Sequence, residues 1–374
     1  MKIGIITFWQ TQDNYGQVLQ CYALQQVLLS LGYSPFLIRY THSEVILLNK
    51  KERILSFIKN IFKKKQKKQT LQYISNTKNR NFEEFKQQYI IQSPKTYKSL
   101  KELQKYPPQA DAYITGSDQV WAKSLYYNEN KTFFLEFGGK NIKRISYAAS
   151  FAMQEYPIEY RKKLKKLLCK FDYISVREKS GVNICASIGC KAQHVLDPTL
   201  LLPFSFYIQA LKIKTKEMKQ LFIYSINISS PNDIRWEEIY KYSIKNNLNT
   251  IITTSSGYVP SNELFGNVTY DYCSIPKWIE NIANSKLVIT TSFHGVVFCL
   301  LCHTNFVYFP LNGKFSGGNN RVIDLLTDLS LKNKIYQPDI SLESIINQFV
   351  DWNKVEKKIE ELRINSLAFL NKAL

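Results

Sequence analysis

The 374-residue sequence lacks any run of about 18 uncharged apolar residues, so no segment is long and apolar enough to span a bilayer as a helix. It also lacks a zinc-binding pattern, a P-loop and the glycine fingerprint of dinucleotide-binding folds. We therefore expect no metal and no cofactor. The short apolar run at residues 3–8 is followed by no small-residue cleavage site, and it predicts a first strand rather than a signal peptide.

Cysteine and histidine are few, with seven and four residues. The cysteines are scattered through mostly apolar settings, which is typical of reduced, buried thiols and predicts a cytoplasmic protein. The sequence Cys299-Leu300-Leu301-Cys302-His303 matches a haem-attachment pattern. It lies within an apolar helical segment, however, so we interpret its cysteines as core residues.

Acidic residues are also scarce, 30 against 50 basic ones, and the formal net charge is +20. Such an excess favours an acidic partner such as nucleic acid, an anionic membrane or a phosphorylated substrate. Only nine of the 50 basic residues are arginine, however, and no groove-binding or base-stacking module is recognisable. We therefore expect no nucleic-acid partner.

Strand and helix patterns alternate along both halves of the chain. Predicted strands lie at residues 3–8, 35–40, 111–115, 144–150, 172–176 and 193–196, and then at 221–226, 250–254, 287–291 and 306–309. The chain is too long for one ordinary core, and its best boundary is the proline-punctuated stretch at residues 197–203. The sequence thus predicts an α/β protein with parallel sheets in two Rossmann-like domains facing a cleft, residues 1–198 and 204–340, followed by a C-terminal helical segment at 341–374.

Residues 50–92 form a predicted basic helical insertion in the first domain. Within residues 50–68, nine side chains are basic, one is acidic, and apolar residues recur at helical spacing. A basic amphipathic helix can lie in the headgroup region of an anionic membrane, which would place the protein peripherally on the inner face of the plasma membrane. The alternative is a helix that packs its apolar stripe on the domain and leaves residues 63–68 solvated.

The sequence Thr290-Thr291-Ser292-Phe293-His294-Gly295 connects a strand-like run to an apolar helical run. In an open α/β sheet, ligands bind at the carboxyl ends of the strands. A helix that begins near His294 also presents free backbone N–H groups to an anion. Ser292, His294 and Gly295 are therefore candidate anion-binding residues. A structural histidine that caps the helix is the competing interpretation.

Four other motifs stand at predicted strand ends or in loops. Asn14-Tyr15-Gly16-Gln17 opens the first long helix, and Ser117-Asp118 with Trp121 offers a carboxylate and an aromatic platform for a sugar. Arg177 follows a strand, and Arg321 ends a glycine-rich loop, where a guanidinium can grip phosphate or carboxylate. The competing interpretations are cap and turn residues for the first and last motifs, a buried Trp121, and a structural ion pair for Arg177.

Six motifs follow one another between about residue 3 and residue 330. They are Asn14-Tyr15-Gly16 with Gln20 and Tyr22-Ala23-Leu24-Gln25, Thr115-Gly116-Ser117-Asp118-Gln119-Val120-Trp121, Ser146-Tyr147-Ala148-Ala149-Ser150, Ser175-Val176-Arg177-Glu178, Val195-Leu196-Asp197-Pro198-Thr199 and Thr291-Ser292-Phe293-His294-Gly295. Together they resemble the polysaccharide pyruvyl transferase family. The resemblance implies a fold of the glycosyltransferase-B type, with the acceptor side in residues 1–198 and the donor side in residues 204–340.

The resemblance also implies a reaction, in which pyruvate passes from phosphoenolpyruvate, a co-substrate, onto two hydroxyls of a sugar as a cyclic ketal. The sugar would belong to a cell-surface polysaccharide or to its lipid-linked precursor. The family's donor-site histidine and arginine match His294 and Arg177. We expect His294 to be the catalytic acid or to hold the phosphate, and Asp118 to be the base for the attacking hydroxyl.

The remaining roles follow from charge and position. The predicted donor-binding residues are Arg177, Ser292, His294, Gly295 and Arg321, and the predicted acceptor-binding residues are Asn14, Tyr15, Gln17, Ser117, Asp118 and Trp121. The alternative function is a glycosyltransferase of the same fold that uses a nucleotide sugar. It would need a ribose-binding carboxylate in the second domain, where no clear Glu or Asp pair stands.

Replacing the five lysines of residues 63–68 by glutamine tests the membrane prediction. Each cation near an anionic surface contributes about 1 kcal/mol, so the change should weaken binding to phosphatidylserine vesicles by roughly 100-fold or more in a sedimentation assay. The matched control replaces the five lysines of residues 162–170 and should bind like the unaltered protein. Equal binding by both variants would show that residues 63–68 do not contact the membrane and would favour the alternative, in which they are solvated.

Overall fold

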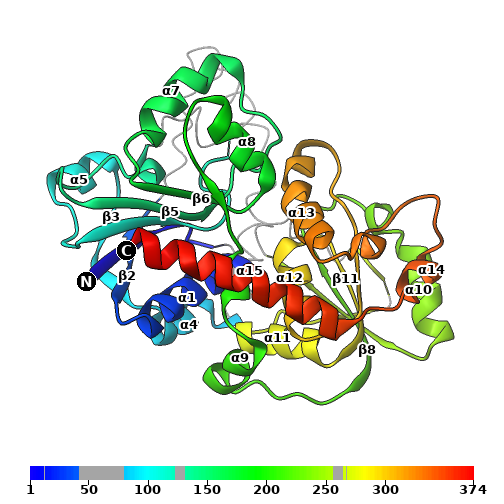
Figure 1. Ribbon diagram of the computed structural model, residues 1–374. Helices are drawn as coiled ribbons and strands as arrows, with labels where there is room; N and C mark the ends of the chain where they lie inside the picture. Colours follow the sequence, from blue (N-terminus) through cyan, green and yellow to red (C-terminus); the bar gives the residue numbers. More distant parts are fainter. Residues whose placement is uncertain (12, 42–79, 123–130, 256–263, 267) are drawn as a thin grey trace, which may run out of the picture.

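A computed structural model describes residues 1–11, 13–41, 80–122, 131–255, 264–266 and 268–374 of the chain, which form two α/β halves (Figure 1). The elements of the first half are β1 (Lys2–Ile6), α1 (Tyr15–Ser30), β2 (Ser34–Tyr40), α4 (Phe82–Tyr89), β3 (Gln92–Tyr97), α5 (Leu100–Lys105), β4 (Ala112–Gly116), η3 (Thr132–Phe134), β5 (Lys143–Ala149), α7 (Ile158–Leu168), β6 (Tyr173–Val176), α8 (Lys179–Ser187) and β7 (Gln193–His194). Of the predicted insertion, residues 50–79 lie outside the described residues, and residues 80–92 lead through α4 into β3.

The connection and the second half continue the alternation. Their elements are η4 (Pro198–Leu201), α9 (Phe204–Leu211), β8 (Met218–Ser225), η5 (Pro231–Ile234), α10 (Trp236–Lys245), β9 (Asn249–Thr254), β10 (Thr269–Tyr270), α11 (Ile275–Ala283), β11 (Ser285–Thr290), α12 (Phe293–Leu301), β12 (Phe306–Tyr308), η6 (Gly313–Asn319), α13 (Asn320–Asp328), η7 (Lys332–Lys334), α14 (Leu342–Ile346) and α15 (Trp352–Ala373).

Both sheets are parallel throughout. The seven-stranded sheet has the order β3-β2-β1-β4-β5-β6-β7, and the five-stranded sheet has the order β10-β9-β8-β11-β12. The predicted fold class, α/β with two parallel Rossmann-like sheets and a C-terminal helix, is confirmed. In each sheet the strand order reverses once, between β1 and β4 and between β8 and β11. Loops diverge at such a reversal, and a crevice opens at the carboxyl ends of the strands.

Two edge strands, β3 and β10, lack the apolar pattern by which strands are predicted from sequence. β3 reads Gln-Ser-Pro-Lys-Thr-Tyr, which lacks an apolar run and contains a proline, and it lies at the edge of its sheet. An edge strand needs hydrogen bonds on only one side, so a proline is tolerated there. β10 is only two residues long. Neither sequence carries the alternation on which strand prediction depends.

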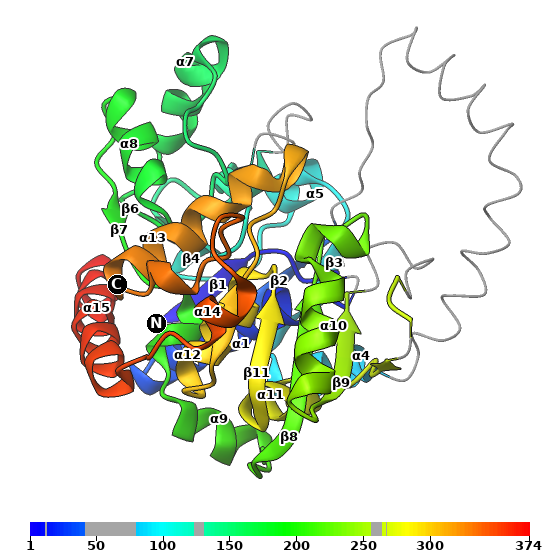
Figure 2. The same cartoon turned by 90° about the vertical axis from the view of Figure 1, so that its right-hand side faces the viewer.

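Side chains from alternate positions of each sheet enter different cores. Leu221 and Ile223 of β8 belong to a cluster with α10, whereas Phe222 and Tyr224 belong to a larger cluster that also contains Ile5 of the first sheet. In the side view, α10 and α12 lie on opposite faces of β8 and β11 (Figure 2). The larger cluster includes α1, α11 and α12, so the two halves share one continuous hydrophobic core.

Helix α15 returns from the second half to the first and ends near the first strand (Figure 1). Arg363 Nε donates to the carbonyl of Leu200 at 2.9 Å, and the backbone N–H of Leu196 donates to Ser366 Oγ at 2.9 Å. The predicted C-terminal helical segment, residues 341–374, consists of two helices, because α14 ends at Ile346 and α15 begins at Trp352. No helix in the described part of the chain is both long and apolar enough to cross a bilayer.

Lys334 joins three segments of the second half from a fully buried position, with 0% exposure. Its ammonium donates to Asn305 Oδ1 at 2.8 Å and to the carbonyls of Ile345, Ile346 and Gln348 at 3.2, 3.2 and 2.7 Å. Burial lowers the pKa of Lys334 to about 8, so the group is still charged at neutral pH. It thereby supplies a donor to the Gln348 carbonyl and a second donor to the carbonyls of Ile345 and Ile346, which also accept from the Gln348 N–H and from Asn305 Nδ2.

Lys334→Met should destabilise the protein, because methionine fills the space but removes the charged donor from Asn305 Oδ1 and from the Gln348 carbonyl. A hydrogen bond to a charged group contributes about 1.5–3 kcal/mol, so the free energy of unfolding should fall by roughly 2 kcal/mol or more in a denaturant titration. Lys332→Met, at an exposed position of η7, is the matched control and should leave the midpoint unchanged. An unchanged midpoint for both variants would contradict the structural role of Lys334.

Candidate functional site

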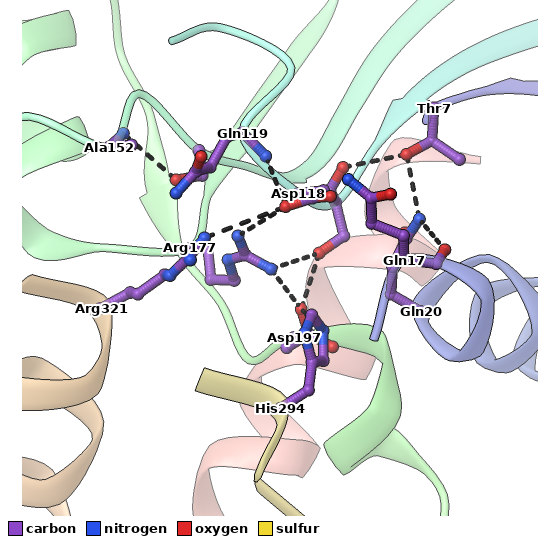
Figure 3. A network of polar contacts seen from close by, with 12 residues as sticks. Thr7, Gln17, Gln20, Asp118, Gln119, Ala152, Arg177, Asp197, His294 and Arg321 are labelled. Atoms are coloured by element: carbon purple, nitrogen blue, oxygen red, sulfur yellow. Dashed lines mark hydrogen bonds and ion pairs between the residues drawn. The ribbon is translucent and has the colours of Figure 1, made fainter. Parts of the chain in front are cut away.

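The carboxyl ends of both sheets contribute to one polar cluster (Figure 3). From the first half, Asp118 follows β4 and Arg177 follows β6. From the second half, His294 lies in the first turn of α12 and Arg321 in the first turn of α13. Asp197, at the connection between the halves, lies among them. The structure thus brings together four of the residues predicted as catalytic or donor-binding.

The carboxylate of Asp197 is the centre of this cluster and is 1% exposed. Its Oδ2 accepts hydrogen bonds from Ser117 Oγ at 2.7 Å and from Arg177 Nη1 at 2.8 Å. Its Oδ1 accepts from the backbone N–H and the hydroxyl of Thr199 at 3.0 and 2.7 Å. Asp197 was predicted only as part of a domain boundary. Its place in the Val195–Thr199 motif was the one signal that could have found it.

Charge balance decides the protonation of this buried group. Burial alone would raise the pKa of the Asp197 carboxyl, but His294, Arg177 and the hydrogen bonds of Thr199 hold that pKa well below its usual value. Burial would likewise lower the pKa of Arg177, but the charges of Asp197 and Asp118 raise it. Asp197 and Arg177 therefore form a fully charged ion pair inside the protein.

His294 is 6% exposed and reaches this pair from the second half. Its Nε2 lies 3.6 Å from Asp197 Oδ2, which is beyond an ordinary hydrogen bond but within range of charge attraction. Ser292 is the N-cap of α12, and its Oγ accepts from the Gly295 N–H at 3.4 Å. Gly295 leaves room for Thr290, since a Cβ there would lie 2.2 Å from Thr290 Oγ1.

The imidazole of His294 also packs against the first turn of α1. A Cβ on Gly16 would lie 1.9 Å from His294 Nδ1 and 2.2 Å from its Cγ. Only glycine at this position lets the helix of the first half approach the ring of the second half so closely. The predicted anion-binding residues Ser292 and Gly295 therefore act here as the cap and the packing position that set where His294 lies.

Two guanidinium groups stack on the same aromatic ring. The Arg177 Cζ lies 4.8 Å and the Arg321 Cζ 5.4 Å from the centroid of Phe293. Asp118 Oδ1 is 3.6 Å from Arg177 Nη2 and 3.9 Å from Arg321 Nη1. With its amide oxygen turned toward Arg321, Gln119 accepts from both terminal nitrogens of that guanidinium at 3.1 Å. Sequence reasoning assigned no role to Phe293, and it placed the amide of Gln119 with the groups that suit sugar hydroxyls.

The two arginines repel each other. Burial and then the charge of Arg177 lower the pKa of Arg321, although Asp118 partly offsets this. A bound anion between the guanidinium groups would relieve that repulsion and would gain charge-assisted hydrogen bonds. The pair, stacked on Phe293, is therefore suited to a small anionic ligand.

Several buried polar atoms of the cluster have no hydrogen-bond partner among the described residues. They are Nε and Nη2 of Arg177, Nε of Arg321, Nε2 of His294 and Oδ2 of Asp118. Asp118 also has a φ of 70°, a left-handed conformation that a non-glycine residue rarely adopts. Unpaired buried donors and local strain of this kind concentrate at functional sites. The cluster therefore has the properties of a binding site for a polar ligand.

The residues predicted to bind an acceptor are mostly internal. Asn14 is the N-cap of α1, and its Oδ1 accepts from the Gln17 N–H at 3.3 Å. Tyr15 is fully buried, donates to the carbonyl of Cys273 at 2.7 Å and stacks on Trp278. Gln17 is partly exposed beside the polar cluster (Figure 3). Ser117 is buried with its hydroxyl bonded to Asp197, so it holds the carboxylate rather than facing solvent.

Trp121 lies in the core rather than on the surface of the site. It is 1% exposed, stacks on Phe134 and donates from Nε1 to the carbonyl of Phe133 at 3.0 Å. The prediction of an exposed platform for a sugar is therefore corrected by the structure. Tryptophan at a strand end satisfies its one donor internally, and its large apolar surface favours burial once aromatic neighbours are in reach.

Comparison with known proteins identifies one matching family and several solved structures of low sequence identity. The family model described as polysaccharide pyruvyl transferase matches residues 14–312. No curated protein sequence matches the chain significantly.

Solved structures resemble the chain only weakly. A UDP-GlcNAc 2-epimerase from Methanocaldococcus jannaschii is 12% identical, with a TM-score of 0.49 over 97% of this chain and 99% of that one. The enzyme of the same name from Neisseria meningitidis is 10% identical, with a TM-score of 0.48 over 100% and 99%. The spinosyn rhamnosyltransferase SpnG is 8% identical, with a TM-score of 0.45 over 99% and 100%.

Gly16→Ala tests the contact between α1 and His294. Alanine favours helices over glycine by about 1 kcal/mol, but the added methyl would displace the ring, and overpacking costs about 1–3 kcal/mol. We expect the free energy of unfolding to fall in a denaturant titration. Gly139→Ala, at an exposed glycine with no atom within 4 Å of the new Cβ, is the matched control and should not be destabilised. A Gly16→Ala protein as stable as the control would contradict the contact.

Proposed function

Because the chain belongs to the polysaccharide pyruvyl transferase family, we propose that it transfers pyruvate from phosphoenolpyruvate onto two hydroxyls of a sugar in a cell-surface polysaccharide or its lipid-linked precursor. The product is a cyclic ketal, and inorganic phosphate is released. The observation that carries the proposal is the pair of stacked guanidinium groups with unpaired donors beside His294. Phosphoenolpyruvate is small and carries a carboxylate and a phosphate, which match two such groups.

The reaction balances with the groups that the cluster supplies. A proton adds to the methylene carbon of the donor, and the neighbouring carbon becomes electron-deficient. The first sugar hydroxyl attacks that carbon and loses its proton to a base. The bond from carbon to the phosphate oxygen then breaks, and the second hydroxyl attacks the same carbon. Of the two hydroxyl protons, one replaces the proton given to the methylene carbon, and the other leaves with phosphate.

Each residue has one role in this scheme. His294 donates the first proton from Nε2, which has no hydrogen-bond partner among the described residues. Asp118 accepts the proton of the attacking hydroxyl at Oδ2, which is also unpartnered. Arg177 and Arg321 bind the carboxylate and the phosphate of the donor through their unpaired N–H groups. Asp197 is a positioning residue, because it holds Arg177 and lies beside His294 without facing an open space.

The burial of the cluster supports this chemistry. His294 is 6% exposed and Asp118 is 7% exposed. An electron-deficient carbon reacts with water as readily as with a sugar hydroxyl, so a site that admits little water protects the intermediate from hydrolysis. Low exposure also strengthens the interaction of both guanidinium groups with an anion.

The decisive experiment incubates the purified protein with phosphoenolpyruvate and a panel of sugars and lipid-linked oligosaccharides. Phosphate release and the mass of the products are measured. We expect phosphate release that depends on the sugar, together with a product that carries one pyruvate ketal. His294→Ala should reduce turnover by about 100-fold or more, the usual contribution of a general acid.

His303→Ala is the matched control, because His303 is exposed, stacks on Trp352 and lies outside the cluster. It should keep full turnover, and circular dichroism should show that both variants are folded. Nucleotide release from nucleotide sugars, with no phosphate released from phosphoenolpyruvate, would instead establish the glycosyltransferase alternative. Unchanged turnover in His294→Ala would remove the histidine from the mechanism.

A further inference from the structure

A cavity lies at the strand reversal of the second sheet, and its lining includes none of the charged residues of the polar cluster. It has a volume of about 290 Å³ and is lined by Asn227, Ile228, Ser229, Asp233, Thr291, Pro310, Leu311, Asn312, Gly313 and Phe315. Asn227–Ser229 follow β8 and Thr291 follows β11, the two strands between which the order of this sheet reverses. Ligands of open α/β sheets bind at such a reversal.

The floor of this cavity is fixed. Thr291 Oγ1 accepts from the Ile226 N–H and donates to the Ile226 carbonyl, both at 2.8 Å, so the ends of β8 and β11 are tied together. The wall formed by residues 310–313 is held by Asn319, whose carboxamide bonds the N–H and the carbonyl of Leu311 at 2.9 and 2.8 Å. The cavity is therefore a built part of the fold rather than a gap between loose loops.

The cavity is also continuous in sequence with the proposed reaction site. Thr291 immediately precedes Ser292, the cap of the helix that carries His294. Segment η6 leads from the cavity to Arg321, and it touches the first half on the way. A Cβ on Gly317 would lie 2.3 Å from the carbonyl oxygen of Ala152. One continuous segment thus connects the cavity wall with the arginine pair.

The chemistry of the lining argues against an anion. Among its described side chains there is one carboxylate, Asp233, and no cation. The Oδ1 of Asn227 is buried without a hydrogen-bond partner among the described residues, and Asn227 has a φ of 60°. Phe315 contributes an aromatic ring that is 37% exposed. Asp233 Oδ2 already accepts from the backbone N–H groups of Ser229 and Ser230 at 2.6 and 3.0 Å. The carboxamide of Asn227 and the hydroxyl of Ser229, beside an apolar ring, are therefore the groups that suit the hydroxyls and the face of a sugar.

We propose that this cavity binds a neutral sugar residue of the acceptor, an inference that rests on the proposed function. Its volume is at the lower end of the range of about 300–1,000 Å³ found for ligand pockets, which fits a sugar ring better than a whole nucleotide sugar. The cavity also supplies what the first half lacks, because Tyr15, Ser117 and Trp121 are internal. The acceptor then lies on the same half as His294.

Binding of simple glycosides in the absence of phosphoenolpyruvate tests this proposal. The probes are the methyl glycosides of galactose, glucose, mannose, N-acetylglucosamine and N-acetylmannosamine, measured by ligand-detected NMR. At least one of them should bind the unaltered protein. Ser229→Trp, which fills the mouth of the cavity from an exposed position, should weaken that binding by 10-fold or more. Phe315→Ala, at a side chain that is 37% exposed, should weaken it several-fold.

Ser205→Trp, at an exposed serine of α9 that does not line the cavity, is the matched control and should bind like the unaltered protein. The proposal is overturned if no glycoside binds, or if Ser229→Trp and Phe315→Ala bind as tightly as the control. It is also overturned if UDP binds and is excluded by Ser229→Trp while the glycosides are unaffected.

The result separates this proposal from the proposed function. Glycosides that bind in the cavity of a protein that never consumes phosphoenolpyruvate would support the sugar site and refute the transfer reaction. Phosphate release that depends on a sugar, with the same acceptor KM in Ser229→Trp as in Ser205→Trp, would support the transfer reaction and refute the sugar site.

Discussion

One buried carboxylate, that of Asp197, sets the geometry of the whole site. A charge without solvent is tolerated only when hydrogen bonds and opposite charge surround it completely. Asp197 meets this requirement with Ser117 from the end of β4, Arg177 from the end of β6 and Thr199 from η4. The same carboxylate faces His294 of the second half. Removing any of these partners would leave the buried charge less completely compensated, so the strand ends and the connection between the halves are held in one arrangement.

That arrangement also depends on close packing between the halves. The shared core includes α1 and α12, and the absence of a side chain at Gly16 lets the two helices meet at the imidazole of His294. Arg177 and Arg321 come from different halves, yet both stack on Phe293. The proposed anion site is therefore shared between the halves. Each half supplies one guanidinium group with at least one buried donor that lacks a partner among the described residues.

The fold and several site residues could be predicted from the sequence. The spacing of apolar residues indicates strands and helices, and the carboxyl ends of parallel strands lie at one edge of the sheet. Strand-like runs ending in polar residues placed Asp118, Arg177 and His294 at one edge of the molecule, and Arg321 followed from its glycine-rich loop. Burial could not be predicted in the same way. Whether Trp121 faces solvent depends on Phe134, and whether Tyr15 does depends on Trp278, contacts that no local pattern encodes. The role of Asp197 could not be predicted, because Pro198 follows it and an Asp-Pro pair is as typical of a linker as of a buried helix cap.

Helix α15 adds a constraint on how the molecule is made. It covers part of the face of the first sheet that α1 also covers, and its bonds to Leu196 and Leu200 join residues more than 160 positions apart in the chain. During synthesis on the ribosome, the first sheet emerges long before residues 352–373 exist to shield it. Nascent chains with uncovered apolar faces are prone to aggregate and are the usual clients of chaperones. Acquisition of the native state is therefore delayed until the second half has been translated, whatever the intrinsic speed of its individual helices.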